Sequence, residues 1–152
     1  MNRRSFVSPV GPISIAEDGG RIVRVDFGAA EDGRASVPIL LEAEKQLRAY
    51  FAGRLKKFDL PLDMRGTEFQ RRVWSALRKS PYGETRSYGD IAAMAGNPKA
   101  CRAVGMANNR NPVSIIVPCH RVVGHDGSLV GYGGGLKAKK FLLELERKSI
   151  SF

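Results

Sequence analysis

The sequence predicts an α/β protein with two lobes: a small antiparallel sheet with one helix, then a mostly helical lobe that contains a helix-turn-helix. Three observations support this prediction. Apolar and polar residues alternate between turn signals in the first third, as they do in half-buried strands. The remainder carries helix-start signals and apolar residues at helical spacing. A length of 152 residues suits one domain, or two small lobes that share an interface.

The N-terminal segment is expected to form strands near residues 4–6 and 13–16, separated by the turn signal SPVGP. EDGG, at residues 17–20, predicts a hairpin, because glycine supplies the positive φ that tight hairpins need. In RIVRVDF, apolar and charged residues alternate, which predicts a third strand. Together these segments indicate a small antiparallel sheet.

A helix is expected over residues 38–52, because Pro38 suits a first helical turn and apolar residues follow at helical spacing. The extended stretch RLKKFDLPLDMRG then predicts a boundary between lobes within residues 54–66. We therefore expect a first domain over residues 1–60 and a second over residues 61–152.

Two capping boxes predict the first helices of the second lobe. Thr67 with Gln70, and Ser87 with Asp90, have the spacing at which each side chain bonds the other's backbone N–H. GNP ends the second of these helices, and KACRAVGMAN predicts a further short one. The last helix is expected near residues 136–147. The second lobe is therefore expected to be mostly helical.

The short helices between about residues 87 and 109 have the proportions of a helix-turn-helix. Lys99 and Arg102 are expected on the exposed side of the second, the recognition helix. This helix is rich in small residues and poor in the long polar side chains that read base edges, which favours backbone-led or minor-groove docking with Arg102 as the long probe. A helix pair that does not contact DNA is the alternative.

The net charge of +10 and the isoelectric point near 10.1 indicate a polyanionic partner. Nucleic acid is the first candidate and an anionic membrane surface the second. Residues 71–110 hold eight Lys/Arg and two acidic residues, so the positive charge is concentrated around the helix pair. No apolar run approaches the roughly 18 residues of a membrane span. Two cysteines do not make a disulfide framework, and their spacing does not fit zinc, so we expect a cytoplasmic, reducing location.

The stretch IVPCHRVVGHDG places Cys119 directly beside His120, in a chain with only two cysteines and two histidines. A nearby histidine can lower the pKa of a cysteine and make it a nucleophile. Neighbours in a strand point to opposite faces, so His120 could act on Cys119 only at a turn or through a water. The preceding SIIV run would bury the site. A buried structural cysteine is the alternative.

PCHRV, preceded by NPVSIIV and followed by GYGGGLKAKKFLLELE, resembles the O6-alkylguanine-DNA alkyltransferases, the methylated-DNA–protein-cysteine methyltransferases. The resemblance extends upstream through GTEFQRRVWSALRKSPYGETRSYGDIAAMAGNPKACRAVGMANNRNP and covers about residues 66–146. The N-terminal third is less similar, but its strands followed by a helix are compatible with the family's ribonuclease-H-like lobe. The resemblance implies direct reversal of DNA damage: an alkyl group moves irreversibly, once per protein, from guanine O6 to a cysteine after minor-groove binding and base flipping.

The resemblance also implies roles for individual residues. Cys119 is the implied alkyl acceptor, His120 the base that acts through a water, and Glu146 the carboxylate that orients His120. Asn111 is implied to hold the turn between the DNA-binding helices and the active-site strand. Tyr88 is implied to help rotate the 3′ phosphate and to donate a proton to the leaving base.

For DNA, the resemblance implies that Arg102 fills the gap left by the flipped nucleotide. The other expected DNA contacts are Tyr88, Lys99, Ala103 and Arg121. The expected guanine pocket consists of Val122, Tyr132, Gly133, Gly134 and Lys139, with the lysine as a second orienting cation. The family often has serine where this chain has Gly133, so here only an amide N–H is available at that position to face O6.

The implied partner is double-stranded DNA that contains O6-alkylguanine, with O4-alkylthymine as a further substrate. No cofactor, metal, membrane or obligate protein partner is expected, and no Cys or His precedes Cys101 to form the N-terminal zinc site of some relatives. The residues are also compatible with two other functions. One is a module that binds lesions in DNA without transferring an alkyl group, and the other is a cysteine-dependent hydrolase, which would need an oxyanion hole.

Overall fold

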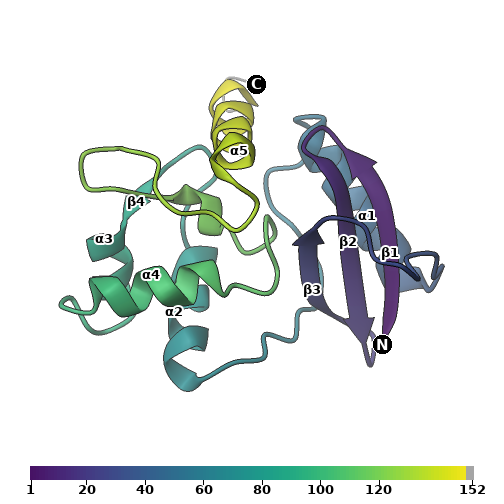
Figure 1. Cartoon of the computed structure of the whole chain (residues 1–152), viewed down its shortest axis with the longest axis horizontal. Coiled ribbons are helices and arrows are strands. Elements are labelled where there is room, and N and C mark those ends of the chain that lie inside the picture. Colours follow the sequence, from purple (N-terminus) through teal and green to yellow (C-terminus); the bar gives the residue numbers. More distant parts are fainter. Residues whose placement is uncertain (150–152) are drawn as a thin grey trace. The chain divides into compact units, whose positions relative to one another are not determined.

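The structure, a computed structural model, describes residues 1–149 and divides into two compact units (Figure 1). Unit 1 consists of Met1–Met64 and Pro112–Ile116, and unit 2 begins at Arg65, runs to Asn111 and resumes at Val117. The expected α/β class is confirmed, with the antiparallel sheet in unit 1 and most of the helices in unit 2.

Unit 1 is a three-stranded antiparallel sheet with one helix against it (Figure 1). Its elements are β1 (Asn2–Ser8), β2 (Gly11–Asp18), β3 (Arg21–Phe27) and α1 (Pro38–Phe51). The alternation seen in the sequence places Ile13 and Ile15 of β2 on the core side, where both are fully buried. Helix α1 contributes Leu40 and Leu47, also fully buried. These apolar faces form the core of the unit.

The segment Pro112–Ile116 belongs to unit 1 because it pairs with β3. The Val25 N–H donates to the Pro112 carbonyl at 2.9 Å, and the Ser114 N–H donates to the Val25 carbonyl at 3.2 Å. The second lobe is therefore not one continuous stretch of chain, although the sequence suggested a single boundary. The long-range pairing of β3 is not visible in any local pattern.

Up to residue 149, unit 2 contains four helices, one 3-10 turn and a two-strand pairing. In order these are α2 (Glu68–Arg78), β4 (Arg86–Ser87), α3 (Tyr88–Met94), α4 (Cys101–Asn109), η1 (Cys119–Arg121), β5 (Val122–Val123) and α5 (Leu136–Ser149). Both predicted capping boxes are present, one at the start of α2 and one at the start of α3. The starts of α2 and α3 are thus determined by local sequence.

Helices α3 and α4 pack on each other and on α2, with the expected break at Gly96, whose φ is +92°. The chain reverses there in a conformation that glycine adopts without strain. The buried indole of Trp74 in α2 donates a hydrogen bond to the Ala107 carbonyl in α4 at 2.9 Å. This bond fixes α4, the predicted recognition helix, against the rest of the unit.

The expected strand before Cys119 is not formed. The apolar run is buried, but it makes only isolated bridges, and Ile115 adopts a φ of +72°. The chain then makes the turn η1, and the only paired strand nearby is β5, which runs parallel to β4. A positive φ at a β-branched residue is unfavourable, so this shape is imposed by the packing around it.

No helix among residues 1–149 is long and apolar enough to cross a bilayer.

Candidate active site and DNA interface

Cys119 begins the turn η1 and is 4% exposed. Two asparagines at and after the end of α4 hold this turn through its carbonyl groups. Asn111 donates its amide N–H to Val117 O at 2.8 Å, and Asn108 donates to Cys119 O at 3.4 Å. Asn111 therefore lies where the resemblance placed it, between the helix pair and the nucleophile, and Asn108 adds a second tie from α4 itself.

Burial raises the pKa of the Cys119 thiol, because a thiolate loses its hydration there. Hydrogen bonds from Asn111 and Tyr132 and the positive charge of Lys139 act in the opposite direction but do not cancel this effect. The thiol is therefore protonated in the resting protein. A reaction that needs the thiolate also needs a base to remove this proton.

His120 and Glu146 form a fully buried pair in which Nε2 lies 2.6 Å from Oε2. Burial would raise the pKa of Glu146, but its bonds to His120 and Arg121 lower that pKa to about 2. A carboxylate only accepts hydrogen bonds, so Nε2 carries the imidazole proton and Nδ1 is the basic nitrogen. Burial, with the charges of Arg121 and Lys139, lowers the pKa of His120 despite Glu146. The imidazole of His120 is therefore neutral and can accept a proton.

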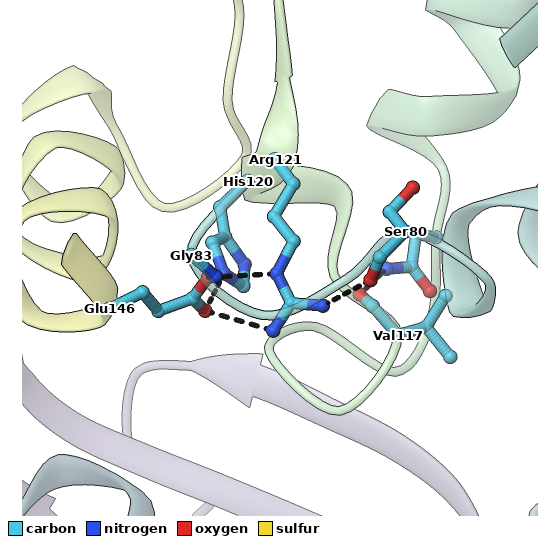
Figure 2. A network of polar contacts seen from close by, with 7 residues as sticks. Ser80, Gly83, Val117, His120, Arg121 and Glu146 are labelled. Carbon is cyan, nitrogen blue, oxygen red and sulfur yellow. Dashed lines mark hydrogen bonds and ion pairs between the residues drawn. The ribbon is translucent and has the colours of Figure 1, made fainter. Parts of the chain in front are cut away.

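Arg121, expected to contact DNA, instead points into unit 2, and its side chain is 8% exposed (Figure 2). Its Nε donates to Glu146 Oε1 at 2.8 Å and its Nη2 to Oε2 at 3.1 Å. Nη1 donates to the Ser80 carbonyl just after α2, at 2.6 Å. The turn η1 directs this side chain toward α5, so Arg121 has buried protein partners in the structure where a DNA contact was expected.

Lys139 of α5 is fully buried and connects two backbone segments below the thiol. Its Nζ donates to Val122 O at 2.5 Å and to Val130 O at 2.8 Å. Burial lowers its pKa, and the neighbouring Cys119 opposes that effect. The structure thus brings Tyr132 and Lys139 to Cys119, and the same lysine holds Val122. That these residues form a guanine pocket stays a prediction.

The glycine loop after Val130 is tied to the residues around the thiol, because the Val130 carbonyl accepts from Lys139 and from Tyr88. Gly133 is exposed and Gly134 is half-buried. A Cβ placed on Gly133 would meet no atom within 4 Å. A larger side chain at position 133 would therefore extend into open space.

The outer face of α4 carries the expected DNA contacts Lys99, Arg102 and Ala103, all exposed, with Lys99 in the turn before the helix. Tyr88, at the start of α3, is half-buried, and a Cβ on Gly105 would lie 3.7 Å from its ring. Its hydroxyl donates to Val130 O at 3.4 Å. Tyr88 therefore connects the helix pair to the glycine loop beside the thiol.

A hollow of about 200 Å³ beside α4 was not anticipated. It lies between the start of α2 and α4, and its lining residues are Thr67, Phe69, Gln70, Ala103, Met106, Ala107 and Arg110. Met106 is 60% exposed, so an apolar side chain forms part of the surface beside this hollow. The sequence signal was present, since Ala103, Met106 and Arg110 recur at helical spacing on one face.

Among the described residues, no three His, Cys, Asp or Glu side chains are grouped in a way that could hold a metal ion.

Unit 2 combines a helix pair that has a basic face with small residues and a buried thiol that is followed in the same turn by a buried imidazole, which is paired with a carboxylate. These features define the class: a DNA-binding protein with a cysteine nucleophile. Comparison with known families agrees with this class. The model for the "6-O-methylguanine DNA methyltransferase, DNA binding domain" matches residues 68–148, and the model for the ribonuclease-like domain of the same proteins matches residues 1–64. The chain belongs to the 6-O-methylguanine DNA methyltransferase family.

Individual relatives are similar over nearly their whole lengths. The methylated-DNA–protein-cysteine methyltransferase of Methanosarcina acetivorans is 54% identical, over 93% of this chain and 95% of that protein. That of Mycobacterium leprae is 52% identical, over 97% and 93%. The crystal structure of Mycobacterium tuberculosis OGT in complex with DNA matches with a TM-score of 0.90 and 48% identity, over 98% of this chain and 94% of that one. The resemblance drawn from the sequence is confirmed, including its N-terminal lobe.

Proposed function

We propose that this protein repairs DNA by moving the alkyl group of O6-alkylguanine in duplex DNA to Cys119, irreversibly and once per molecule. The observation that carries the proposal is the buried thiol of Cys119 in one unit with the buried His120–Glu146 pair and the exposed face of α4. The relatives are named methylated-DNA–protein-cysteine methyltransferases, and this name states a transfer from methylated DNA to a protein cysteine.

In the proposed reaction, His120 removes the thiol proton of Cys119 through a water, and Glu146 stabilises the imidazolium that forms. The thiolate attacks the alkyl carbon, so the S–C bond forms as the C–O6 bond breaks. The departing guanine takes up a proton from Tyr88, which is restored by the proton held on His120. In balance, the thiol proton ends on guanine and the alkyl group ends on sulfur. The thioether is stable, so the protein is not regenerated. O4-alkylthymine offers the same kind of alkyl–oxygen bond.

The alkyl carbon is inside the base stack, so the nucleotide must first be flipped out, at a cost of a few kcal/mol. The small exposed residues of α4 allow the helix to lie close to the minor groove. Arg102 is exposed on that face and long enough to occupy the vacated space. The flipped base enters beside Tyr132 and Gly133. Because both cysteines are free thiols, the function requires a reducing compartment, and the cytoplasm is the proposed location.

The test is mass spectrometry after incubation with duplex DNA that contains O6-methylguanine. The wild-type protein should gain one methyl group, on Cys119, with a stoichiometry that does not exceed one per protein. Cys119→Ser should bind the duplex but gain no mass. Cys101→Ser, which changes the other, exposed cysteine, is the matched control and should react like wild type.

Two results would contradict the proposal. Tight binding by the wild type without any mass gain would indicate a lesion-binding module. Release of product beyond one equivalent would indicate a hydrolase that regenerates its thiol.

A further inference from the structure

We propose that Arg121 is a positioning residue for alkyl transfer: its guanidinium shares the Glu146 carboxylate with His120 and thereby keeps the imidazole neutral and correctly oriented to accept the Cys119 proton. The inference rests on the proposed function, in which His120 is the base. It also gives a role to a side chain that the sequence had assigned to DNA.

Both oxygens of Glu146 are held from two sides (Figure 2). Oε1 accepts from Arg121 Nε at 2.8 Å and from the Gly83 N–H at 3.3 Å, and Oε2 accepts from His120 at 2.6 Å and from Arg121 Nη2 at 3.1 Å. The planar fork of arginine fits both oxygens at once, which a point charge such as lysine does not. The carboxylate plane is therefore fixed, and with it the ring that bonds to Oε2.

Arg121 is itself anchored at its far end. Nη1 donates to the Ser80 carbonyl at 2.6 Å, just beyond the C-terminus of α2, where a cation is favoured. The guanidinium also lies 5.6 Å from the centre of the Tyr82 ring. These contacts join α5, which carries Glu146, to the end of α2. Through the side chain of Arg121, both α2 and α5 thus help to hold His120 in its orientation.

The charges around His120 explain why a second partner for Glu146 matters. Glu146 and Lys139 face it from α5, Arg121 and the Cys119 thiol lie on its own turn, and the phenol of Tyr132 lies by the thiol. Glu146 alone would favour a protonated imidazole, which cannot act as a base. Arg121 neutralises this carboxylate, and with Lys139 it disfavours a further positive charge on the ring. Imidazolium then forms only when the thiolate does.

The experiment compares wild type with Arg121→Met, which keeps an unbranched apolar stem but removes the charge, and with Arg121→Lys, which keeps the charge but not the fork. His120 is followed by NMR across roughly pH 5 to 9, a window in which histidine ordinarily titrates. His125, which is exposed, is the internal reference and the only other histidine. Transfer is measured over the same range with O6-benzylguanine as a free base, so that DNA binding does not enter.

We expect His120 of the wild type to be neutral near pH 7 with the proton on Nε2. In Arg121→Met its protonation midpoint should rise by about one unit or more, and the acid limb of the transfer rate should move with it, so that the rate at pH values below both midpoints falls about tenfold. Arg121→Lys should leave the midpoint close to that of wild type but lower the rate at every pH, because the carboxylate is no longer held in plane.

Three results would overturn the inference. One is an unchanged His120 midpoint in a folded Arg121→Met protein whose rate falls equally at all pH values, which would indicate a purely structural role. Another is a variant whose only defect is DNA binding. The third needs no variant: a wild-type His120 that is already imidazolium near pH 7. Failure of the proposed function is recognised separately, because a wild type that never methylates Cys119 can still be titrated by NMR.

Discussion

Unit 1 and unit 2 differ in charge. Unit 1 has ten Lys/Arg and nine Asp/Glu, for a net charge of +1, whereas unit 2 has fifteen and six, for +9. Nearly all of the net charge of +10 therefore belongs to the unit that carries the helix pair and the thiol. Long-range attraction to DNA is a property of one half of the molecule, and the charge of the other half is balanced at its surface.

The two units also differ in what they bury. Within residues 1–149, unit 1 buries the polar side chains of Ser8 and Glu17, and unit 2 buries those of Ser80, Asn108, Asn111, His120, Arg121, Lys139, Glu146 and Ser149. Buried polar and charged groups lower stability unless they are fully paired. Unit 2 therefore depends on the pairing of its buried polar groups, whereas unit 1 has few such groups to pair.

The largest expected effect comes from removing a buried carboxylate of unit 2. Glu146→Gln leaves Arg121 buried without its counter-charge and should lower the free energy of unfolding by about 3–5 kcal/mol. It should also slow transfer, with little effect on DNA binding. Because the folded-state pKa of Glu146 is about 2, below its unfolded value, its stabilisation is present above that unfolded value and lost as pH falls toward 2. Urea unfolding at several pH values measures the loss of stability and its dependence on pH.

The matched change in unit 1 is Glu17→Gln. Glu17 accepts a hydrogen bond from Asn2 on Oε1 and one from the Gly20 N–H on Oε2, so a glutamine can keep only one of the two, but its loss leaves no buried cation unpaired. We expect a much smaller loss of stability and an unchanged transfer rate. If Glu146→Gln and Glu17→Gln lowered the free energy of unfolding equally, the two units would not differ in how strongly their stability depends on buried charged groups.

An intermediate effect is expected at the DNA face. Arg102→Ala should lower the rate on duplex O6-methylguanine about tenfold or more, because filling the gap offsets part of the few kcal/mol that flipping costs. The rate on free-base O6-benzylguanine should not change. Arg24→Ala in unit 1 removes an exposed arginine that is paired with Asp26, and it should affect neither rate. Equal losses by Arg102→Ala on both substrates would exclude insertion into the duplex.

The smallest effect is expected at the open edge of the pocket. Gly133→Ser adds a hydroxyl where there is space, so stability should change by no more than about 0.5 kcal/mol. Transfer of methyl should become a few-fold faster relative to benzyl, since the hydroxyl can face O6 but narrows the entrance. Gly135→Ser is the control: its surroundings are equally open, but its φ of +91° strains any side chain. Identical behaviour of the two variants would show that the hydroxyl has no specific role.

Local signals made much of unit 2 predictable. The capping boxes at Thr67 and Ser87 and the break at Gly96 each depend on residues within one helical turn, and the structure confirms all three. The proximity of Glu146 to His120 was expected only through the family resemblance, because the two are 26 positions apart in the chain. The spacing of these residues in the sequence does not by itself predict that α5 packs against η1.

The expectations that differ from the structure concern segments whose conformation depends on contacts with residues far away in the sequence. The run before Cys119 has the composition of a strand, but Val113 pairs with Val25 instead, and the chain must turn at Ile115 to reach the site. Arg121 was expected among the DNA contacts, but in the structure its side chain bonds to Glu146 and to the Ser80 carbonyl. The overlooked signal was the expected Glu146 itself, since a buried carboxylate next to a neutral imidazole needs a further cation.

The hydrogen bond between Trp74 and Ala107 has a practical consequence. This is the only tryptophan of the chain, and its indole lies at the joint between α2 and the helix that would enter the groove. Indole emission responds to the polarity and hydrogen bonding around the ring. The protein thus contains its own fluorophore at the DNA-docking element, and stopped-flow fluorescence of the unlabelled chain can time docking separately from the chemistry at sulfur.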